Sequence, residues 1–295
     1  MNPWIKAFRL RTLPLALSGW MVGIAIAYNH SEVNWVVASL TLLTAFLLQI
    51  LSNLANDYGD ASSGVDTKRT GEERMVSSGK ISAPAMKRAM IVFSLLALIS
   101  GILLLYSAFP DDWVSSLIFL GIGIIGIGAA IKYTVGKNPY GYAGFGDVFV
   151  FVFFGVVLVF GTYYLQTQWL NWEVLLPASS IGLFSVGVLN VNNIRDIASD
   201  KDAGKNSIPV RIGRENAVIY HIALLQIGMI LSIIFASINF QSWWSFIFVF
   251  VNALLIVNIK AVKNKPTDQL DSYLKQMAIS TLLFSLLFSL GQVLV

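Results

Sequence analysis

The sequence contains no cysteine and only two histidines, and both shortages narrow its chemistry. Without cysteine the chain forms no disulfide and has no catalytic thiol. His30 and His221 are too few and too far apart in sequence for a histidine-based metal centre. Charge is scarce as well, since Asp, Glu, Lys and Arg make up 12% of 295 residues, about half the usual share. Hydrophobic residues make up 56%, which excludes an ordinary soluble fold.

The few charged residues are separated by long uncharged runs. Each run has at least 19 residues, close to the roughly 20 that a transmembrane helix needs. The run 216–259 is long enough for two helices, because its polar, aromatic middle at residues 239–244 is typical of a turn at the membrane interface. The other runs are 12–31, 33–56, 89–110, 113–131, 148–172, 174–194 and 276–295. We therefore predict an all-α, polytopic membrane protein with nine transmembrane helices.

The basic residues all fall on one side of these expected helices. Alternate loops contain all 20 Lys and Arg residues and 12 Asp and Glu residues, a charge of 20 − 12 = +8, while the other loops carry −4. The basic loops are residues 1–11, 57–88, 132–147, 195–215 and 260–275. Because cytoplasmic loops carry the excess of Lys and Arg, we expect a cytoplasmic N-terminus and an extracytoplasmic C-terminus. Since topology accounts for every basic residue, we expect no nucleic-acid partner.

Two of the basic loops contain a repeated pattern of polar residues. A shift of 140 residues places residues 53–67, which we call motif 1, on residues 193–207, which we call motif 2. Both follow Asn-x2-(Asn/Asp)-x3-Asp-x3-Gly-x2-(Thr/Ser), and offsets of 0, 3 and 7 put three polar groups on one face of a helix. The matched pairs are Asn53 with Asn193, Asn56 with Asp196, Asp60 with Asp200, Gly64 with Gly204 and Thr67 with Ser207. We therefore expect one domain of residues 1–295 with an internal repeat, in which each copy presents oxygen ligands at a cytoplasmic helix end.

The side chains in both motifs suit a divalent cation that bridges to an anion. Polar groups at the ends of membrane helices are unfavourable and commonly mark functional sites. The alternative, that the acids merely solvate a loop, is the one we favour for Glu72, Glu73, Asp268 and Asp271. Oxygen ligands without cysteine favour Mg²⁺ over Zn²⁺. Lys and Arg are interleaved with these carboxylates, which favours a diphosphate held by Mg²⁺ and basic side chains over a simple cation carrier.

A third cytoplasmic segment, residues 130–147, is rich in tyrosine and stands directly before an apolar run of 25 residues. Its polar and aromatic residues include Lys132, Tyr133, Lys137, Tyr140, Tyr142 and Asp147. One interpretation is a pocket for an aromatic substrate. The other is a belt of aromatic residues at the membrane interface.

Together these motifs resemble the UbiA-type intramembrane prenyltransferases, which join a polyprenyl diphosphate to an aromatic or other acceptor. Residues 53–60, 133–147 and 189–205 are most similar to the menaquinone branch, whose acceptor is 1,4-dihydroxy-2-naphthoate. The resemblance implies nine helices around a central chamber, with Asp-rich cytoplasmic loops after the second and sixth. The chain departs from the family pattern at Gly64, where many members have Asp, which leaves Asp66 as the nearest carboxylate. It also has Met75 after Arg74 where members have Pro.

The resemblance also implies roles for individual residues. The Mg²⁺ ligands would be Asn53, Asn56, Asp57, Asp60, Asn193, Asp196 and Asp200. The side chains that bind diphosphate would be Lys68, Arg69, Arg74, Arg195 and Lys205. Asp57 or Asp147 would accept the phenolic proton, and the rings of Tyr133 and Tyr142 would face the allylic cation. Lys132, or less favourably Lys137, would bind the carboxylate of the acceptor.

The activity implied by this resemblance is transfer of a polyprenyl group to 1,4-dihydroxy-2-naphthoate with loss of CO₂ and diphosphate. The product would be demethylmenaquinol, an intermediate of menaquinone biosynthesis, made in the bacterial cytoplasmic (inner) membrane by a chamber open sideways to the lipid. The nearest alternative is another aromatic acceptor such as 4-hydroxybenzoate. A secondary transporter also uses internal repeats and interrupted helices, but both motifs lie at helix ends on one side, which argues against alternating access.

Overall fold

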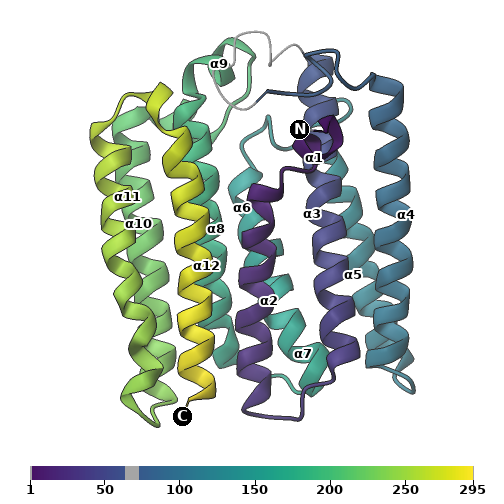
Figure 1. The fold of residues 1–295 in the computed structure, drawn as a ribbon, viewed down its shortest axis with the longest axis vertical. Helices are drawn as coiled ribbons and strands as arrows, with labels where there is room; N and C mark the ends of the chain where they lie inside the picture. The colour runs from purple at the N-terminus through teal and green to yellow at the C-terminus, as the bar shows by residue number, and fades with distance from the viewer. Residues whose placement is uncertain (1, 64–72, 295) are drawn as a thin grey trace.

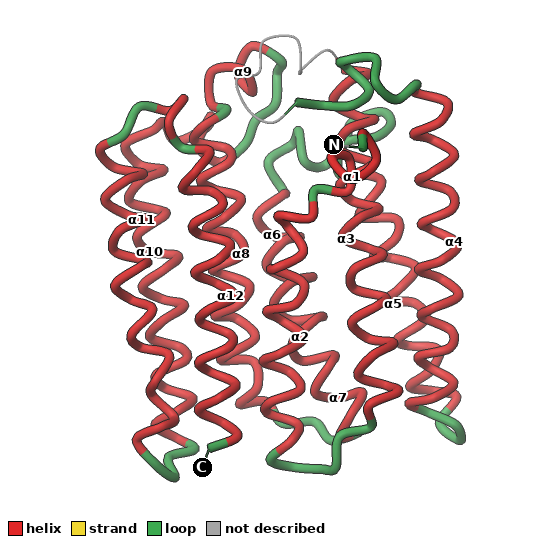
Figure 2. The backbone as a smooth tube through the Cα atoms, in the orientation of Figure 1, coloured by secondary structure: helices red, strands yellow, loops and turns green. Residues whose placement is uncertain are grey.

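The computed structural model describes residues 2–63 and 73–294, and those residues form helices joined by loops (Figure 2). Within them, nine helical segments are long and apolar enough to cross a membrane, which confirms the predicted number. The segments run side by side, with the N-terminus near one end of the bundle and the C-terminus at the other (Figure 1). Lys68 and Arg69, both predicted to bind diphosphate, and Asp66 lie outside the described residues.

The elements of the described residues follow one another along the chain in a fixed order. They are α1 (Pro3–Phe8), η1 (Leu10–Thr12), α2 (Leu13–Tyr28), α3 (Trp35–Ser63), α4 (Ala83–Ala108), α5 (Trp113–Lys132), α6 (Gly146–Val150), η3 (Phe151–Phe160), α7 (Gly161–Thr167), η4 (Trp172–Val174), α8 (Leu175–Arg195), α9 (Ile197–Asp202), α10 (Ile208–Ile238), η5 (Trp243–Val251), α11 (Asn252–Asn264), η6 (Thr267–Gln269) and α12 (Asp271–Val293).

The long uncharged run 216–259 does contain two helices. The first, α10, ends at Ile238, and the second begins as the 3-10 segment η5 at Trp243. The residues between them form the turn that the polar, aromatic middle of the run predicted. This turn lies at the end of the bundle opposite α9 (Figure 1).

Several spans are not regular α-helices, and the uncharged runs did not predict where they deviate. The first span breaks at Arg9, whose φ of 48° places it in the left-handed region, before α2 begins with Pro14 in its first turn. The fifth span contains η3, a π-helix of 10 residues. Such segments are rare and often occur at functional sites.

The most extensive hydrophobic cluster among the described residues lies on one side of the bundle, around α8, with smaller clusters on the side of α3 and α4. In α8, 72% of the membrane-spanning stretch is buried, against 17% in α5. Phe184 of α8 packs edge-on against Phe284 of α12, and Phe248 and Phe288 join the same cluster. The helices α3, α4 and α5 form the other side (Figure 1) and leave many apolar side chains exposed, as expected of helices that face lipid.

Candidate active site

A cavity of about 370 Å³ lies between α2, α3, α4, α5, the fifth span and α8. Its polar and charged lining residues include Arg9, Arg11, Gln49, Asn56, Asp60, Arg74, Asn192 and Lys205. The rest of the wall is mainly apolar and reaches Leu104, Phe119 and Leu165, which lie close to the opposite ends of their helices. The cavity therefore has a charged end near the two motifs and an apolar extension into the bundle.

Residues 53–63 of motif 1 form the end of the helix α3, which is longer than a membrane crossing requires. With 29 residues, α3 is about 43 Å long, more than the hydrocarbon core of roughly 30 Å. Asp60 is buried at 2% exposure and lines the cavity, where its Oδ2 accepts a hydrogen bond from Arg74 Nη2 at 2.7 Å. Its Oδ1 accepts one from the hydroxyl of Tyr142 at 3.0 Å. Asp60 and Arg74 thus form a buried ion pair at the charged end of the cavity.

The other predicted ligands of motif 1 have different surroundings. Both oxygens of Asp57 accept backbone N–H groups, from Met75 and Val76, each at 2.9 Å. This contact holds the turn that carries Arg74. Asn56 lines the cavity, and its Oδ1 accepts a hydrogen bond from the Thr134 hydroxyl at 3.3 Å. Asn53 also lines the cavity, and its Nδ2 donates to the hydroxyl of Thr12 and the carbonyl of Phe8, each at 2.9 Å.

Motif 2 is not one continuous helix, contrary to the pattern-based expectation. The helix α8 ends at Arg195, Asp196 has non-helical dihedral angles, and α9 starts at Ile197. The guanidinium of Arg195 binds both oxygens of Asp196 at 2.8 Å and also Asp271 at 2.5 Å. Arg195 therefore points to protein partners, and the structure does not place it on the cavity wall as the sequence predicted for a diphosphate ligand.

Asp200 and Lys205 do come together as predicted. Asp200 is 1% exposed and accepts hydrogen bonds from Lys205 Nζ at 3.4 Å and the Ser207 hydroxyl at 3.3 Å. Lys205 lines the cavity. Motif 2 thus contributes a cation to the charged end, backed by a buried carboxylate.

Asn192, and not the predicted ligand Asn193, lies on the cavity wall. Asn192 lines the cavity, and its Oδ1 accepts a hydrogen bond from Arg195 at 2.9 Å. The predicted Asn193 is buried, and its Oδ1 has no hydrogen-bond partner among the described residues. Consecutive residues of a helix point about 100° apart, so a shift of one position changes which side chain faces the cavity.

The break in the first span places three further residues on the cavity wall, which were not among the predicted site residues. Arg9, Arg11 and Thr12 line the cavity. The hydroxyl of Thr12 accepts hydrogen bonds from Gln49 and Asn53 of α3, each at 2.9 Å, which fixes the short η1 segment against motif 1. Arg11 also contacts Asp271 at 3.3 Å. The sequence signal for this segment was two arginines followed by Pro14, which lies in the first turn of α2.

Three predicted catalytic residues lie outside the cavity wall, namely Asp57, Lys132 and Asp147. Lys132 is exposed and donates to the carbonyl of Lys137 at 2.7 Å, so its position does not support the predicted role in binding the acceptor carboxylate. Asp147 is buried beside the wall residue Gly146, and its Oδ2 accepts a hydrogen bond from the Tyr220 hydroxyl at 2.9 Å.

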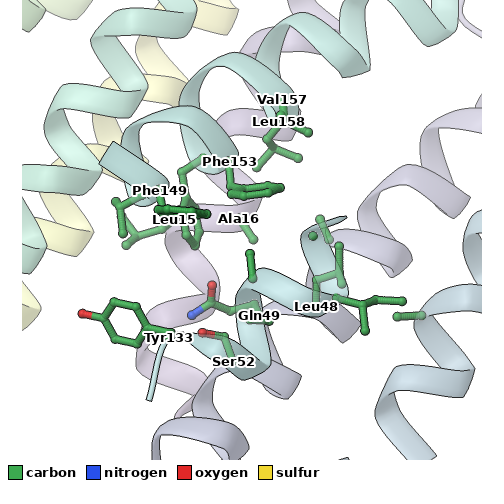
Figure 3. A pocket seen from close by; sticks show the side chains of 18 of the residues that line it. Leu15, Ala16, Leu48, Gln49, Ser52, Tyr133, Phe149, Phe153, Val157 and Leu158 are labelled. Carbon is green, nitrogen blue, oxygen red and sulfur yellow. The ribbon is translucent and has the colours of Figure 1, made fainter. Parts of the chain in front are cut away.

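Aromatic rings line the cavity between its charged and apolar parts. Tyr133 packs edge-on against Tyr140, which stacks on Phe149 at 3.9 Å between centroids, and Phe149 is followed by Phe153 one turn further on. Figure 3 shows Phe149 and Phe153 across the pocket from Gln49. Burial, and secondarily Tyr133, raises the pKa of Tyr140 above its ordinary value, so its hydroxyl stays protonated and donates to the carbonyl of Ala129. The tyrosine-rich segment is therefore a pocket wall rather than only an interfacial belt.

The oxygen donors on this wall fit a magnesium ion that arrives with a phosphate ligand. Among the described residues, no three His, Cys, Asp or Glu side chains form a cluster that would hold a metal alone. The wall does present the carboxylate of Asp60 and the amides of Asn56 and Asn192. Mg²⁺ is usually bound by one or two carboxylates together with substrate phosphates and water, which is the donor set found here.

The fold and this cavity define a multi-pass membrane protein with an internal site for an amphiphilic ligand that has an anionic head. The chain belongs to the UbiA prenyltransferase family, whose model matches residues 16–282. The 1,4-dihydroxy-2-naphthoate octaprenyltransferases of Haemophilus influenzae and Escherichia coli are each 42% identical to it. The first alignment covers 99% of this chain and 96% of the relative, and the second covers 98% and 94%.

Solved structures support the same fold. A UbiA homologue from Aeropyrum pernix K1 matches with a TM-score of 0.73 over 97% of this chain and 98% of its own, at 16% identity. A UbiA homologue from Archaeoglobus fulgidus bound to GPP and Mg²⁺ matches with a TM-score of 0.65 over 97% of this chain and 99% of its own, at 15% identity. At these identities the likeness shows the fold alone.

Proposed function

We propose that this protein transfers a polyprenyl group from polyprenyl diphosphate to 1,4-dihydroxy-2-naphthoate, with loss of CO₂ and diphosphate, to give demethylmenaquinol. The observation that carries the proposal is the two-part cavity, charged beside both motifs and apolar beyond them, which matches a diphosphate head and an isoprenoid tail. Two relatives that are 42% identical over nearly the whole chain are named for this activity. The match over residues 16–282 supports a single prenyltransferase domain.

Mg²⁺ is the proposed cofactor. Asp60, Asn56 and Asn192 line the cavity and would hold it together with the diphosphate. Asp200 is buried off the lining, where it pairs with the wall residue Lys205, and it is the further ligand that we propose from motif 2. Bound there, Mg²⁺ would withdraw negative charge from the diphosphate as the carbon–oxygen bond breaks.

Of the other predicted ligands, Asn53 lines the cavity but donates its Nδ2 to Phe8 and Thr12, Asp57 and Asp196 accept hydrogen bonds from protein donors, and Asn193 is buried off the lining. We assign these four to holding the motifs in shape.

The basic side chains of the charged end would bind the diphosphate directly. Arg74 and Lys205 each line the cavity and each pair with a motif carboxylate, Asp60 and Asp200. Such pairing fixes the cations before the substrate enters, so little reorganisation accompanies ionisation. The apolar part of the cavity would exclude water from the allylic cation, and the faces of Tyr133 and Phe149 would stabilise it.

The acceptor ring would lie against Tyr133, Phe149 and Phe153. Its carboxylate needs a cation separate from those of the diphosphate. We assign this role to Arg11, which lines the cavity and whose neighbour Thr12 accepts a hydrogen bond from Gln49 of α3. The proton acceptor stays open between Asp57 and Asp147. Asp147 is the better placed of the two, since it adjoins Gly146 on the wall whereas both oxygens of Asp57 hold backbone N–H groups.

The proposed location is the cytoplasmic membrane of a bacterium, with both motifs and the N-terminus on the cytoplasmic side. The placement of all 20 basic residues in alternate loops supports this orientation. The odd number of spans in the described part of the chain supports opposite sides for the two termini.

The direct test is an assay of purified protein with Mg²⁺, a polyprenyl diphosphate and 1,4-dihydroxy-2-naphthoate labelled in its carboxyl group. We expect one labelled CO₂ per prenylated product. If the protein instead prenylates 4-hydroxybenzoate and keeps the carboxylate, the assignment to menaquinone biosynthesis is wrong while prenyl transfer stands. Absence of product with every aromatic acceptor would overturn both.

A further inference from the structure

The loop of residues 133–145, which we call the bridging loop, connects the two motifs. On the motif 1 side, the hydroxyl of Thr134 donates to the carbonyl of Ala55 at 2.9 Å and to Asn56 Oδ1 at 3.3 Å. The backbone of Thr134 lies so close to α3 that a Cβ at Gly59 would be 2.6 Å from its carbonyl oxygen. The loop is therefore packed tightly against motif 1.

The same loop is bonded to motif 2. The backbone N–H of Asn206 donates to the carbonyl of Tyr142 at 2.9 Å, and Arg211 donates to the carbonyl of Ala143. Gly144 has a φ of 79°, and a Cβ there would lie 2.5 Å from the Asn206 carbonyl oxygen. Any side chain at position 144 would collide with the Asn206 carbonyl. The close contact between the backbones of the loop and motif 2 therefore requires glycine there.

Tyr142 is the residue that contacts both motifs. Its carbonyl accepts from motif 2, and its hydroxyl donates to Asp60 Oδ1 while Arg74 holds the other oxygen. We propose that Tyr142 is a positioning residue that fixes the Asp60 carboxylate toward the cavity and sets the separation of the two motifs. The inference rests on the proposed function, because it assigns Asp60 to the binding of Mg²⁺ and diphosphate.

The hydroxyl of Tyr142 acts on Asp60 through one oxygen of the carboxylate. An ionised carboxylate has about four acceptor sites, and the bonds from Tyr142 and Arg74 fall on different oxygens of Asp60. Hydrogen bonds to a ligating carboxylate fix its orientation, and their loss typically weakens metal binding roughly 10- to 100-fold. Tyr142→Phe removes this bond and leaves the backbone contact to Asn206 in place.

The experiment measures thermal unfolding of the purified full chain in detergent, with fixed inorganic pyrophosphate and increasing Mg²⁺. The readout is the Mg²⁺ concentration that gives half of the maximal rise in Tm. We expect Tyr142→Phe to raise this concentration roughly tenfold or more. The matched control is Tyr106→Phe on α4, whose side chain is 78% exposed on the outer face, and it should behave as the wild type.

A double-variant cycle separates positioning from a general structural effect. If Tyr142 acts through Asp60, then adding Tyr142→Phe to Asp60→Asn changes the Mg²⁺ midpoint no further. An additive effect, or an unchanged midpoint in Tyr142→Phe, overturns the inference. A wild-type protein whose Tm does not respond to Mg²⁺ with pyrophosphate would instead contradict the diphosphate site of the proposed function, so the two failures are distinguishable.

Discussion

At the scale of single residues, the chemistry of the site depends on ion pairs that are already formed before a ligand binds. Asp60 with Arg74, and Asp200 with Lys205, are buried pairs with side chains no more than 6% exposed. Removing one partner of such a pair leaves an unpaired buried charge, which destabilises a protein by several kcal/mol. Variants at these positions should therefore keep the shape and polarity of the residue.

The carboxylates of the two motifs give the first prediction. We expect Asp60→Asn and Asp200→Asn each to lower kcat roughly 10²- to 10³-fold, because each loses a charge that stabilises the departing diphosphate. Asp202→Asn, on the exposed side of α9, should change kcat far less. Steady-state assays at saturating Mg²⁺ decide this, and near-normal turnover in either motif variant would exclude a two-motif metal site.

The pocket cations give the second prediction. We expect Arg11→Gln to raise the KM for the naphthoate acceptor roughly 10- to 100-fold, because one charge-assisted hydrogen bond to the acceptor is lost. The KM for the diphosphate should change less. Arg74→Gln should instead raise the KM for the diphosphate more than the KM for the acceptor. Lys132→Met is the contrast, since its ammonium donates to a loop carbonyl. If Lys132→Met raises the acceptor KM and Arg11→Gln does not, the cation predicted from the sequence is the correct one.

Residues on the cavity wall could be predicted from the sequence only where the repeated motif and its neighbouring charges indicated a specific side chain. Asp60, Arg74 and Lys205 follow from the repeat and the interleaved charges, and all three line the cavity. Asn193 was predicted rather than Asn192 because the two motifs align without a gap, but both asparagines lie in α8 and Asn192 is the one on the cavity wall. The rotation of a helix about its own axis depends on tertiary packing, which the repeat pattern does not encode.

At the scale of elements, close backbone contact between α3 and the bridging loop determines how motif 1 is held. We predict that Gly59→Ala lowers the Tm of the purified protein, because the new Cβ would sit 2.6 Å from the Thr134 carbonyl. Gly128→Ala on α5 is the matched control, since no atom lies within 4 Å of its Cβ position and alanine favours a helix by roughly 1 kcal/mol. A Tm that is equal in the two variants would contradict this packing.

At the scale of the whole molecule, the number of helices could be predicted because the bilayer sets their length and excludes charge from it. Gaps between charged residues therefore locate the spans, including the two helices on either side of residues 239–242. The cavity could not be predicted in this way. Its wall combines side chains from η1, α3, the bridging loop and α8, and their meeting depends on tertiary packing and on the break at Arg9.

The last prediction concerns the orientation of the molecule. Because all 20 basic residues lie in alternate loops and the described chain has nine spans, we expect the C-terminus outside the cytoplasm. Alkaline phosphatase fused after Val295 should be active, and a fluorescent protein fused there should be dark. The matched control is fusion after Lys265, before α12, where the two reporters should behave in the opposite way. Equal behaviour at both sites would mean that α12 does not cross the membrane, which would place both termini on the same side.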